Sequence, residues 1–194
     1  MKKNIVYILS LTFLLNLGCK ENTKTDSQNL DREKTNEILT QIINDSTDLY
    51  MDTNCISEKN RLLYTIFTTD LNNYIKNQLG INEEEHLKNQ MELFHNFRFT
   101  ENLTFGKQII TVLDFKEFEN QAENGNYTFW TWLDSNCENG YLSISKPVFN
   151  ETFDKAFVII GSICGGKCGG GETRFYKFKN GKWKIEKTEF EWIS

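Results

Sequence analysis

The spacing of apolar residues changes near residue 100, and this change most limits the folds open to the chain. From Thr35 to about Phe97, apolar residues recur every three or four positions, which predicts amphipathic helices. From about Gln108 the chain consists of short runs rich in β-branched and aromatic residues, which predicts strands. Helices followed by a strand meander indicate an α+β fold, in which helices pack on one face of an antiparallel sheet.

Three helices are expected in the first part of the chain. Their ranges are 35–49, 57–79 and 82–97. Thr35 and Asn82 are candidate N-caps, because their side-chain oxygens can accept hydrogen bonds from free backbone amides. Gly80 is a natural stop signal for the second helix. The helical half is thus expected over 35–98 and a β-rich half over 99–194, within one α+β domain of residues 35–194.

Turn signals separate the runs that we expect to form strands. Asn-Gly pairs begin at Asn124, Asn139 and Asn180, and this pair tolerates the positive φ angles of hairpin turns. In the last run the apolar alternation changes phase after Ile185, so we expect a bulge or short turn near 186–189. The expected strands are 108–115, 127–133, 141–149, 155–163, 173–178 and 182–193.

The N-terminus is typical of an export signal. A basic start, Met1-Lys2-Lys3, precedes a mostly apolar stretch over 5–17, which is shorter than the ~20 residues that span a membrane as a helix. This stretch ends in Leu-Asn-Leu-Gly-Cys19, which resembles the lipobox of bacterial lipoprotein precursors. The resemblance implies that 1–18 is a cleaved signal peptide and that Cys19 carries acyl chains. The alternative is an ordinary signal peptide followed by an unmodified cysteine.

The lipobox resemblance also implies where the protein is located. Two or more acyl chains hold a protein on a membrane, so the membrane would be its partner through Cys19. The polar stretch over 19–34 is expected to be a flexible tether. Lys20-Glu21 resembles the charged sorting signals of Bacteroidota surface lipoproteins. We therefore expect an exported protein anchored to a bacterial membrane, on the periplasmic or surface face of the outer membrane.

Composition excludes one broad class of partner. The chain has a formal net charge of -5 and a pI near 5.2. A general nucleic-acid binder needs a basic face to neutralise phosphates, so no nucleic-acid partner is expected. An unknown protein or small molecule remains as the second partner.

The five cysteines divide into one and four. With Cys19 reserved for lipid, an even number remains, and an exported compartment can be oxidising. The four allow three pairings. Cys164 and Cys168 are close enough in sequence to pair across a tight loop, which leaves Cys55 with Cys137. The alternative is four buried free thiols.

A glycine-rich segment over 161–171 surrounds the close pair of cysteines. It matches the start of a phosphate loop by count, but Cys168 stands where a magnesium ligand should be. A metal site based on Cys164 and Cys168 is a second interpretation, although no matching pair of ligands with zinc spacing follows. A redox site is a third, although the spacing is one residue longer than in thioredoxin-type motifs. We favour a hairpin loop closed by a disulfide, with glycines required by unusual φ and ψ angles. The amides of Gly165, Gly166 and Gly169, with Lys167, form a candidate anion-binding loop.

The C-terminal part also resembles a family. The residues that carry this resemblance are Ser145, Pro147 and Phe149, the loop from Cys164 to Gly171, Asn180 to Trp183, and the terminal Trp192 to Ser194. They are similar to those of uncharacterised exported proteins of Bacteroidota, many of them lipoproteins, which share a Cys-Gly-x-x-Cys-Gly-x-Gly loop and a terminal Trp-Ile-Ser. The family implies no established activity.

Other residues that could carry chemistry have simpler readings. Trp130 and Trp132 would share one face of a strand and could stack on a sugar or peptide, although core packing is the plainer use. Glu83-Glu84-Glu85 before His86 is typical of a solvated helix start, and His95 of the edge of an aromatic face. The sequence therefore indicates no catalytic residues, no metal and no cofactor.

We predict a lipid-anchored binding or scaffolding module of the cell envelope. Two alternatives remain open. One is an envelope enzyme, for example a thiol–disulfide protein that uses Cys164 and Cys168. The other is an inhibitor or immunity protein.

Overall fold

The computed structural model describes residues 19–62, 70–125 and 128–194. The chain divides into two compact units, Met1–Lys34 and Thr35–Ser194. Within the described residues no helix is both long enough and apolar enough to cross a membrane.

The second unit is built from helices and one sheet. Its helices are α4 (Leu71–Leu79), α5 (Glu84–Asn96), α6 (Val112–Glu123) and α7 (Phe129–Asn136), together with the C-terminal part of α2 (Cys19–Ile43). Two short 3-10 turns lie at Leu49–Met51 and Glu101–Leu103. The strands are β1 (Cys55–Ser57), β2 (Gln108–Ile110), β3 (Tyr141–Ile144), β4 (Val148–Phe149), β5 (Lys155–Gly165), β6 (Cys168–Lys179) and β7 (Lys182–Ile193).

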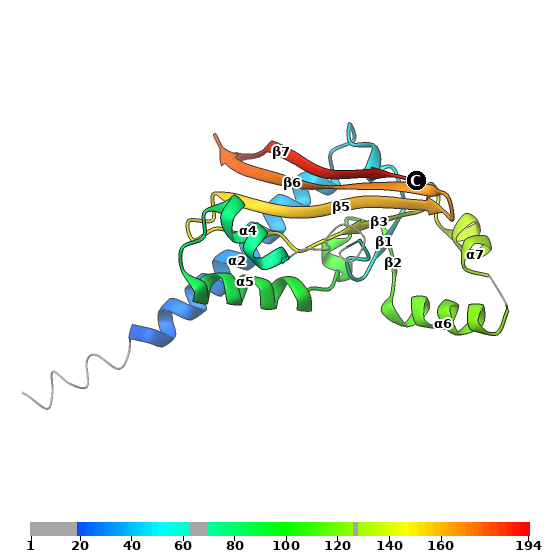
Figure 1. Cartoon of the computed structure of the whole chain (residues 1–194), viewed down its shortest axis with the longest axis horizontal. Coiled ribbons are helices and arrows are strands. Elements are labelled where there is room, and N and C mark those ends of the chain that lie inside the picture. The colour runs from blue at the N-terminus through cyan, green and yellow to red at the C-terminus, as the bar shows by residue number, and fades with distance from the viewer. Residues whose placement is uncertain (1–18, 63–69, 126–127) are drawn as a thin grey trace, which may run out of the picture. The chain divides into compact units, whose positions relative to one another are not determined.

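The strands form one sheet in the order β2-β1-β3-β5-β6-β7, and β4 also pairs with β5. Figure 1 shows β5, β6 and β7 as long strands that run side by side. These pairs are antiparallel, as expected, but β1 runs parallel to both β2 and β3. The α+β class is therefore confirmed, but the sheet is mixed rather than antiparallel. Its parallel pairs involve β1, a strand in the part of the chain expected to be helical.

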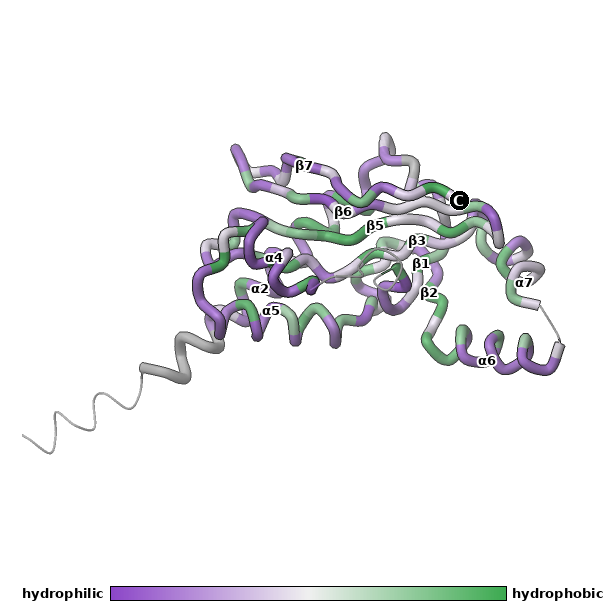
Figure 2. The backbone as a smooth tube through the Cα atoms, viewed as in Figure 1, coloured by the Kyte–Doolittle hydropathy of each residue, from purple (hydrophilic) through white to green (hydrophobic). Residues whose placement is uncertain are grey.

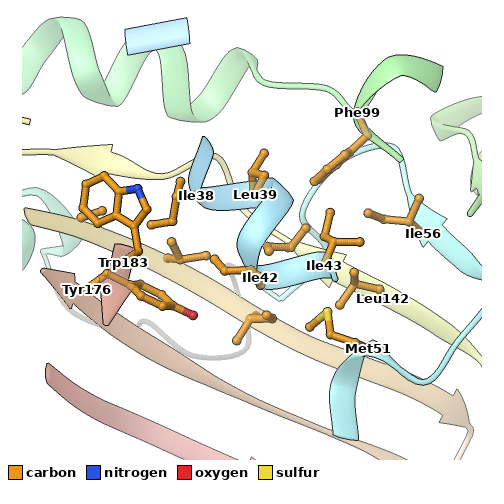
Figure 3. Packing of buried hydrophobic residues seen from close by; sticks show 14 of the residues in the cluster. Ile38, Leu39, Ile42, Ile43, Met51, Ile56, Phe99, Leu142, Tyr176 and Trp183 are labelled. Carbon is orange, nitrogen blue, oxygen red and sulfur yellow. The ribbon is translucent and has the colours of Figure 1, made fainter. Parts of the chain in front are cut away.

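Helices cover both faces of the sheet rather than one. Alternate residues of β5 point to opposite sides, so Val158 and Ile160 pack with Ile42 of α2, as in the cluster of Figure 3. Phe157 and Ile159 face the other way, into a cluster with α4 and α5. Figure 2 shows α5 and α6 alternating between hydrophilic and hydrophobic positions, as expected for helices with one buried side.

The helix expected over 57–79 is wrong at its start. Cys55 to Ser57 form a buried strand, and residues 63–69 of that expected helix lie outside the described residues. Its end is correct, because Gly80 has a left-handed φ of 71° and caps α4. Asp70, a residue not singled out from the sequence, caps the start of α4 through hydrogen bonds from the backbone amides of Asn72 and Asn73.

Neither of the two candidate N-caps, Thr35 and Asn82, begins a helix. Thr35 is buried inside α2, which begins upstream and ends at Ile43 rather than at 49. Helix α5 begins after Glu83 instead of Asn82. A distant loop contributes a carboxylate just before its first turn, since Glu151 accepts hydrogen bonds from the backbone amides of Asn82 (2.7 Å) and Glu83 (3.1 Å). A negative charge near the start of a helix interacts favourably with the helix dipole.

Two expected strands are partly helical. Run 127–133 falls mainly in α7, and run 108–115 is a strand only as far as Ile110. Thr111 then caps α6, and its side chain and that of Asp114 form a reciprocal capping box. Short apolar runs fit a strand or a buried helix equally well, so their surroundings decide between the two.

The hairpin between β6 and β7 confirms the sharpest turn prediction. Asn180 and Gly181 have φ angles of 54° and 76° at the tip of this hairpin. The other two Asn-Gly pairs join a helix to the next element instead. The expected irregularity in β7 is present. The pairing register between β6 and β7 shifts between Phe175 and Tyr176 of β6, and it shifts again nearer the end of β7.

In the first unit, the stretch over 19–34 is helical rather than an irregular tether. Between Lys20 and Ile43 the chain contains neither glycine nor proline, and many of its residues have good helix propensity. The cleaved signal expected over 1–18 lies outside the described residues.

Candidate functional site

The two disulfides predicted from cysteine spacing are present. Cys164 and Cys168 close the β5–β6 hairpin, with Cα atoms 5.0 Å apart and Gly165 paired directly with Cys168. The turn at the tip is formed by Gly166 and Lys167, which are exposed. The disulfide therefore fixes the register of two central strands at their shared end.

Close packing, not unusual backbone angles, requires some of the glycines of this hairpin. None of the residues from 161 to 171 has a positive φ, so the expectation that unusual φ and ψ angles require these glycines is wrong. A methyl group at Gly171 would lie 2.7 Å from Nε1 of Trp192, so only glycine lets this indole lie against β6. The anion-binding role of Gly165, Gly166, Lys167 and Gly169 stays a prediction.

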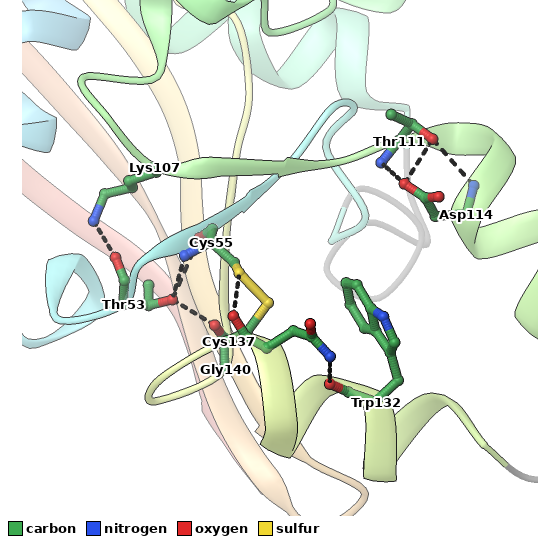
Figure 4. The surroundings of a disulfide bond; sticks show 9 residues. Thr53, Cys55, Lys107, Thr111, Asp114, Trp132, Cys137 and Gly140 are labelled. Carbon is green, nitrogen blue, oxygen red and sulfur yellow. Dashed lines mark hydrogen bonds between the residues drawn. A yellow bond between two sulfur atoms is a disulfide. The ribbon is translucent and has the colours of Figure 1, made fainter.

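The second disulfide ties α7 to the sheet. Cys55 lies on β1, Cys137 follows the last residue of α7, and both are almost fully buried. Figure 4 shows Thr53 beside this bridge, where its hydroxyl accepts a hydrogen bond from the amide of Cys55 (3.2 Å) and donates one to the carbonyl of Gly140. Lys107 donates to the carbonyls of Met51 (2.9 Å) and Thr53, and burial lowers its pKa.

Helices α6 and α7 and strand β3 enclose a cavity of about 250 Å³, which we call the aromatic pocket. Helix α6 presents four residues to it at helical spacing, and Arg61 reaches it from the segment after β1. Its lining consists of Arg61, Phe115, Phe118, Glu119, Ala122, Phe129, Trp130 and Tyr141. Of these residues, only Trp130 is a candidate ligand-binding residue from the sequence.

The rings in the aromatic pocket pack against one another at tilted angles. Phe129 lies at the centre, with its centroid 5.6 Å from Phe115, 5.2 Å from Phe118 and 4.8 Å from Trp130. Tyr141 closes one side, 5.5 Å from Phe115, and burial raises its pKa to about 12. These mutual contacts hold the lining in place, so the pocket is apolar and largely pre-formed.

A paired arginine and glutamate supply the charged groups of the pocket. Nη2 of Arg61 lies 3.0 Å from Oε1 of Glu119, and the two side chains are 39% and 62% exposed. The Arg61 guanidinium also stacks 4.3 Å from the centre of the Phe115 ring. The backbone amide of Arg61 donates to Oγ of Ser143 (2.7 Å), which fixes the chain at this point.

The tip of the disulfide hairpin lies beside Trp130 of this pocket. A methyl group added at Gly166 would lie 3.6 Å from the indole Nε1, so the space between them would just hold a methyl group. A strand would place Trp130 and Trp132 on one face, but they lie on helix α7. Side chains two positions apart on a helix point roughly 200° apart around its axis, so the two indoles face different ways. Trp130 is 37% exposed and lines the pocket, whereas Trp132 packs against Phe118 with centroids 5.1 Å apart.

A second cavity, of about 640 Å³, lies on the other side of the same hairpin. Cys164, Cys168, Gly169 and Arg174 are among its lining residues. Arg174 is ion-paired with both Asp48 and Glu172. Burial opposes its charge, but the hydrogen bond to Asp48 and its other partners outweigh burial and raise its pKa. Because two carboxylates already neutralise this guanidinium, it does not offer a free anion site.

The two histidines occupy structural positions. His86 Nε2 lies 2.9 Å from the carbonyl oxygen of Phe149, and its ring packs edge-on against Phe153. His95 packs against Phe94 with centroids 5.4 Å apart. Across the described residues, histidine, cysteine and acidic side chains form no group of three that could hold a metal ion.

A capping box and a helical spacing were the signals that could have revealed the pocket. Thr111 and Asp114 have the three-residue separation of a capping box. Phe115, Phe118 and Ala122 then follow at positions that share one side of a helix. Nothing in the sequence indicates that Arg61 lies beside them, because that contact depends on the path of the chain after β1.

The chain matches no protein-family model, no curated protein and no solved structure. The family membership expected from the sequence motifs therefore stays a prediction.

Proposed function

We propose that this chain is an exported, lipid-tethered module that binds a small ring-shaped molecule in the aromatic pocket. The observation that carries the proposal is the pocket itself. It combines five aromatic rings, a cavity of about 250 Å³ and one ion pair. Cavities with an apolar, largely pre-formed lining and a few placed polar groups are typical of small-molecule sites.

The chemistry of the lining favours binding over catalysis. Arg61 and Glu119 form an ion pair with each other, and both side chains are open to solvent, at 39% and 62% exposure. The hydroxyl of Tyr141 has a pKa of about 12, so it stays protonated at neutral pH. These groups can orient a ligand by charge and hydrogen bonding without transferring a proton.

Two features support export and tethering. The Cys55–Cys137 and Cys164–Cys168 disulfides are expected in an oxidising compartment. The apolar stretch that ends in Gly18-Cys19 supports lipid attachment at Cys19. Each buried methylene of an acyl chain contributes about 0.8 kcal/mol, so two chains would hold the module on a membrane.

Isothermal titration calorimetry tests the pocket, with benzyl alcohol, indole and methyl glucoside as neutral ring probes. We expect at least one of them to bind, and Trp130→Ala to abolish that binding. Ala122→Phe is a second variant, which fills the cavity without removing an aromatic wall. Ile193→Ala is the control, because it removes an apolar side chain that is 90% exposed and lies outside the pocket lining. It should leave the affinity for every probe unchanged. Failure of every probe, or binding that survives both pocket variants, would refute the binding proposal.

Incorporation of labelled palmitate tests the tether. The full precursor expressed in a bacterial host should take up label and sediment with membranes, and Cys19→Ser should abolish both. The matched control is the double variant Cys164→Ser/Cys168→Ser, which loses two thiols but keeps Cys19. Label that persists in Cys19→Ser would place the lipid elsewhere and contradict the proposal.

A further inference from the structure

We propose that the ligand of the aromatic pocket is a zwitterionic aromatic amino acid, with its carboxylate at Arg61, its ammonium at Glu119 and its ring among the aromatic side chains. This inference rests on the proposed binding function and narrows it to one class of molecule. It draws on the size of the cavity, the sum of its charges and the rigidity of the groups that carry them.

The cavity has room for one ring and a few further atoms. Its volume of about 250 Å³ is below the ~300–1,000 Å³ typical of sites for drug-sized ligands. Phe118, Phe129 and Trp130 offer faces and edges for a ring to pack in the tilted geometries that aromatic groups prefer. A single aromatic side chain fits this description, whereas a chain of several sugars does not.

The charges at the pocket add to zero. A ligand with only a carboxylate would approach Arg61 but would also meet the carboxylate of Glu119. A ligand with only an ammonium would meet the guanidinium in the same way. A zwitterion places each of its charges beside the opposite one, so four charges alternate in sign and neither protein charge loses its partner.

Both charged side chains are positioned before any ligand arrives. Arg61 is held by its stacking on Phe115 at 4.3 Å and by the hydrogen bond from its backbone amide to Ser143. Glu119 lies on α6, and its carboxylate is held by the ion pair with Arg61. Little side-chain entropy is therefore lost when a ligand bridges the pair. A planar guanidinium can in addition bind a carboxylate through two hydrogen bonds.

The test compares four ligands that share a phenyl ring in calorimetric titrations of the full mature chain. L-phenylalanine has both charges, 3-phenylpropionate lacks the ammonium, phenethylamine lacks the carboxylate, and benzyl alcohol is neutral. Because each half-exposed charge contact contributes modestly, we expect L-phenylalanine to bind about tenfold more tightly than either singly charged ligand.

Two variants assign the charges. Glu119→Gln should remove the preference of L-phenylalanine over 3-phenylpropionate, and Arg61→Gln should remove its preference over phenethylamine. Glu117→Gln is the matched control, because Glu117 lies exposed on α6 outside the pocket lining and accepts a hydrogen bond from Gln121 of the same helix. It should leave all four affinities unchanged.

The outcomes separate the two proposals. If benzyl alcohol binds in a manner that depends on Trp130 but L-phenylalanine gains nothing over it, the zwitterion inference is wrong and the ring-binding function stands. The inference is also wrong if L-phenylalanine is preferred but neither charge variant changes that preference. If no phenyl ligand binds at all, both this inference and binding of aromatic rings in the pocket fail.

Discussion

Replacing Cys55 and Cys137 together by alanine removes the bridge that joins β1 to α7. The two residues are separated by 82 positions in the sequence, and their Cα atoms are 5.4 Å apart in the fold. The bridge therefore closes a long loop in the unfolded chain. By the loop-entropy relation, a loop of this length stabilises the folded state by about 4.5 kcal/mol at 25 °C.

The short bridge provides a matched comparison. Cys164 and Cys168 are separated by only 4 positions. The same relation gives about 2 kcal/mol for such a loop. A domain of this size has an unfolding free energy of about 5–15 kcal/mol. Loss of the long bridge should therefore remove a large share of the stability, and loss of the short one a smaller share.

Urea unfolding, followed by circular dichroism and by tryptophan fluorescence, measures the difference. We expect Cys55→Ala/Cys137→Ala to lose about 2–3 kcal/mol more than Cys164→Ala/Cys168→Ala. The m-value should rise for the first variant, because an unfolded chain without the long loop constraint exposes more surface. Alanine at both positions avoids the reactive free thiol that a single replacement would leave.

Equal losses would refute this reasoning. So would a greater loss from the short bridge, since loop length would then not govern the contribution of either disulfide. Burial adds to the expected difference, because Cys55 and Cys137 are 0% and 3% exposed and their truncation also leaves small cavities.

Three further predictions follow from single contacts. A water-soluble dithiol should reduce the disulfide of exposed Cys168 well before that of buried Cys55. Mass spectrometry of alkylated peptides would show the order, and simultaneous alkylation of both cysteine pairs would contradict the prediction. A hydrogen bond from Thr152 lowers the pKa of Asp154, so its stabilising effect is present above about pH 4 and is lost as the pH falls through the folded-state pKa. The difference in unfolding free energy between the wild type and Asp154→Asn should then shrink from pH 6 to about pH 3; a constant difference would exclude ionisation as the cause. Gly181→Ala should cost about 1 kcal/mol in urea unfolding, because its φ of 76° disfavours a Cβ atom; an unchanged midpoint would show that the turn relaxes.

Much of the architecture could be predicted where the signal is local. Gly80 ends α4, Asn180-Gly181 forms the β6–β7 turn, and Cys164 pairs with Cys168 across a few residues. The aromatic pocket could not be predicted in this way. Arg61 and Tyr141 are far apart in the sequence and meet only because β1 pairs with β3.

The sequence by itself determined the α+β class, most strands from residue 141 onward and the pairing of the last four cysteines. Each of these follows from side-chain periodicity or from residues a few positions apart, and such signals act in any environment. Only the tertiary structure decided that β1 is a parallel strand, that 129–136 is a helix and that helices cover both faces of the sheet. Those outcomes depend on which apolar surface each segment can bury, and a short aromatic run such as that around Trp130 satisfies a strand or a helix equally well until its partners are in place.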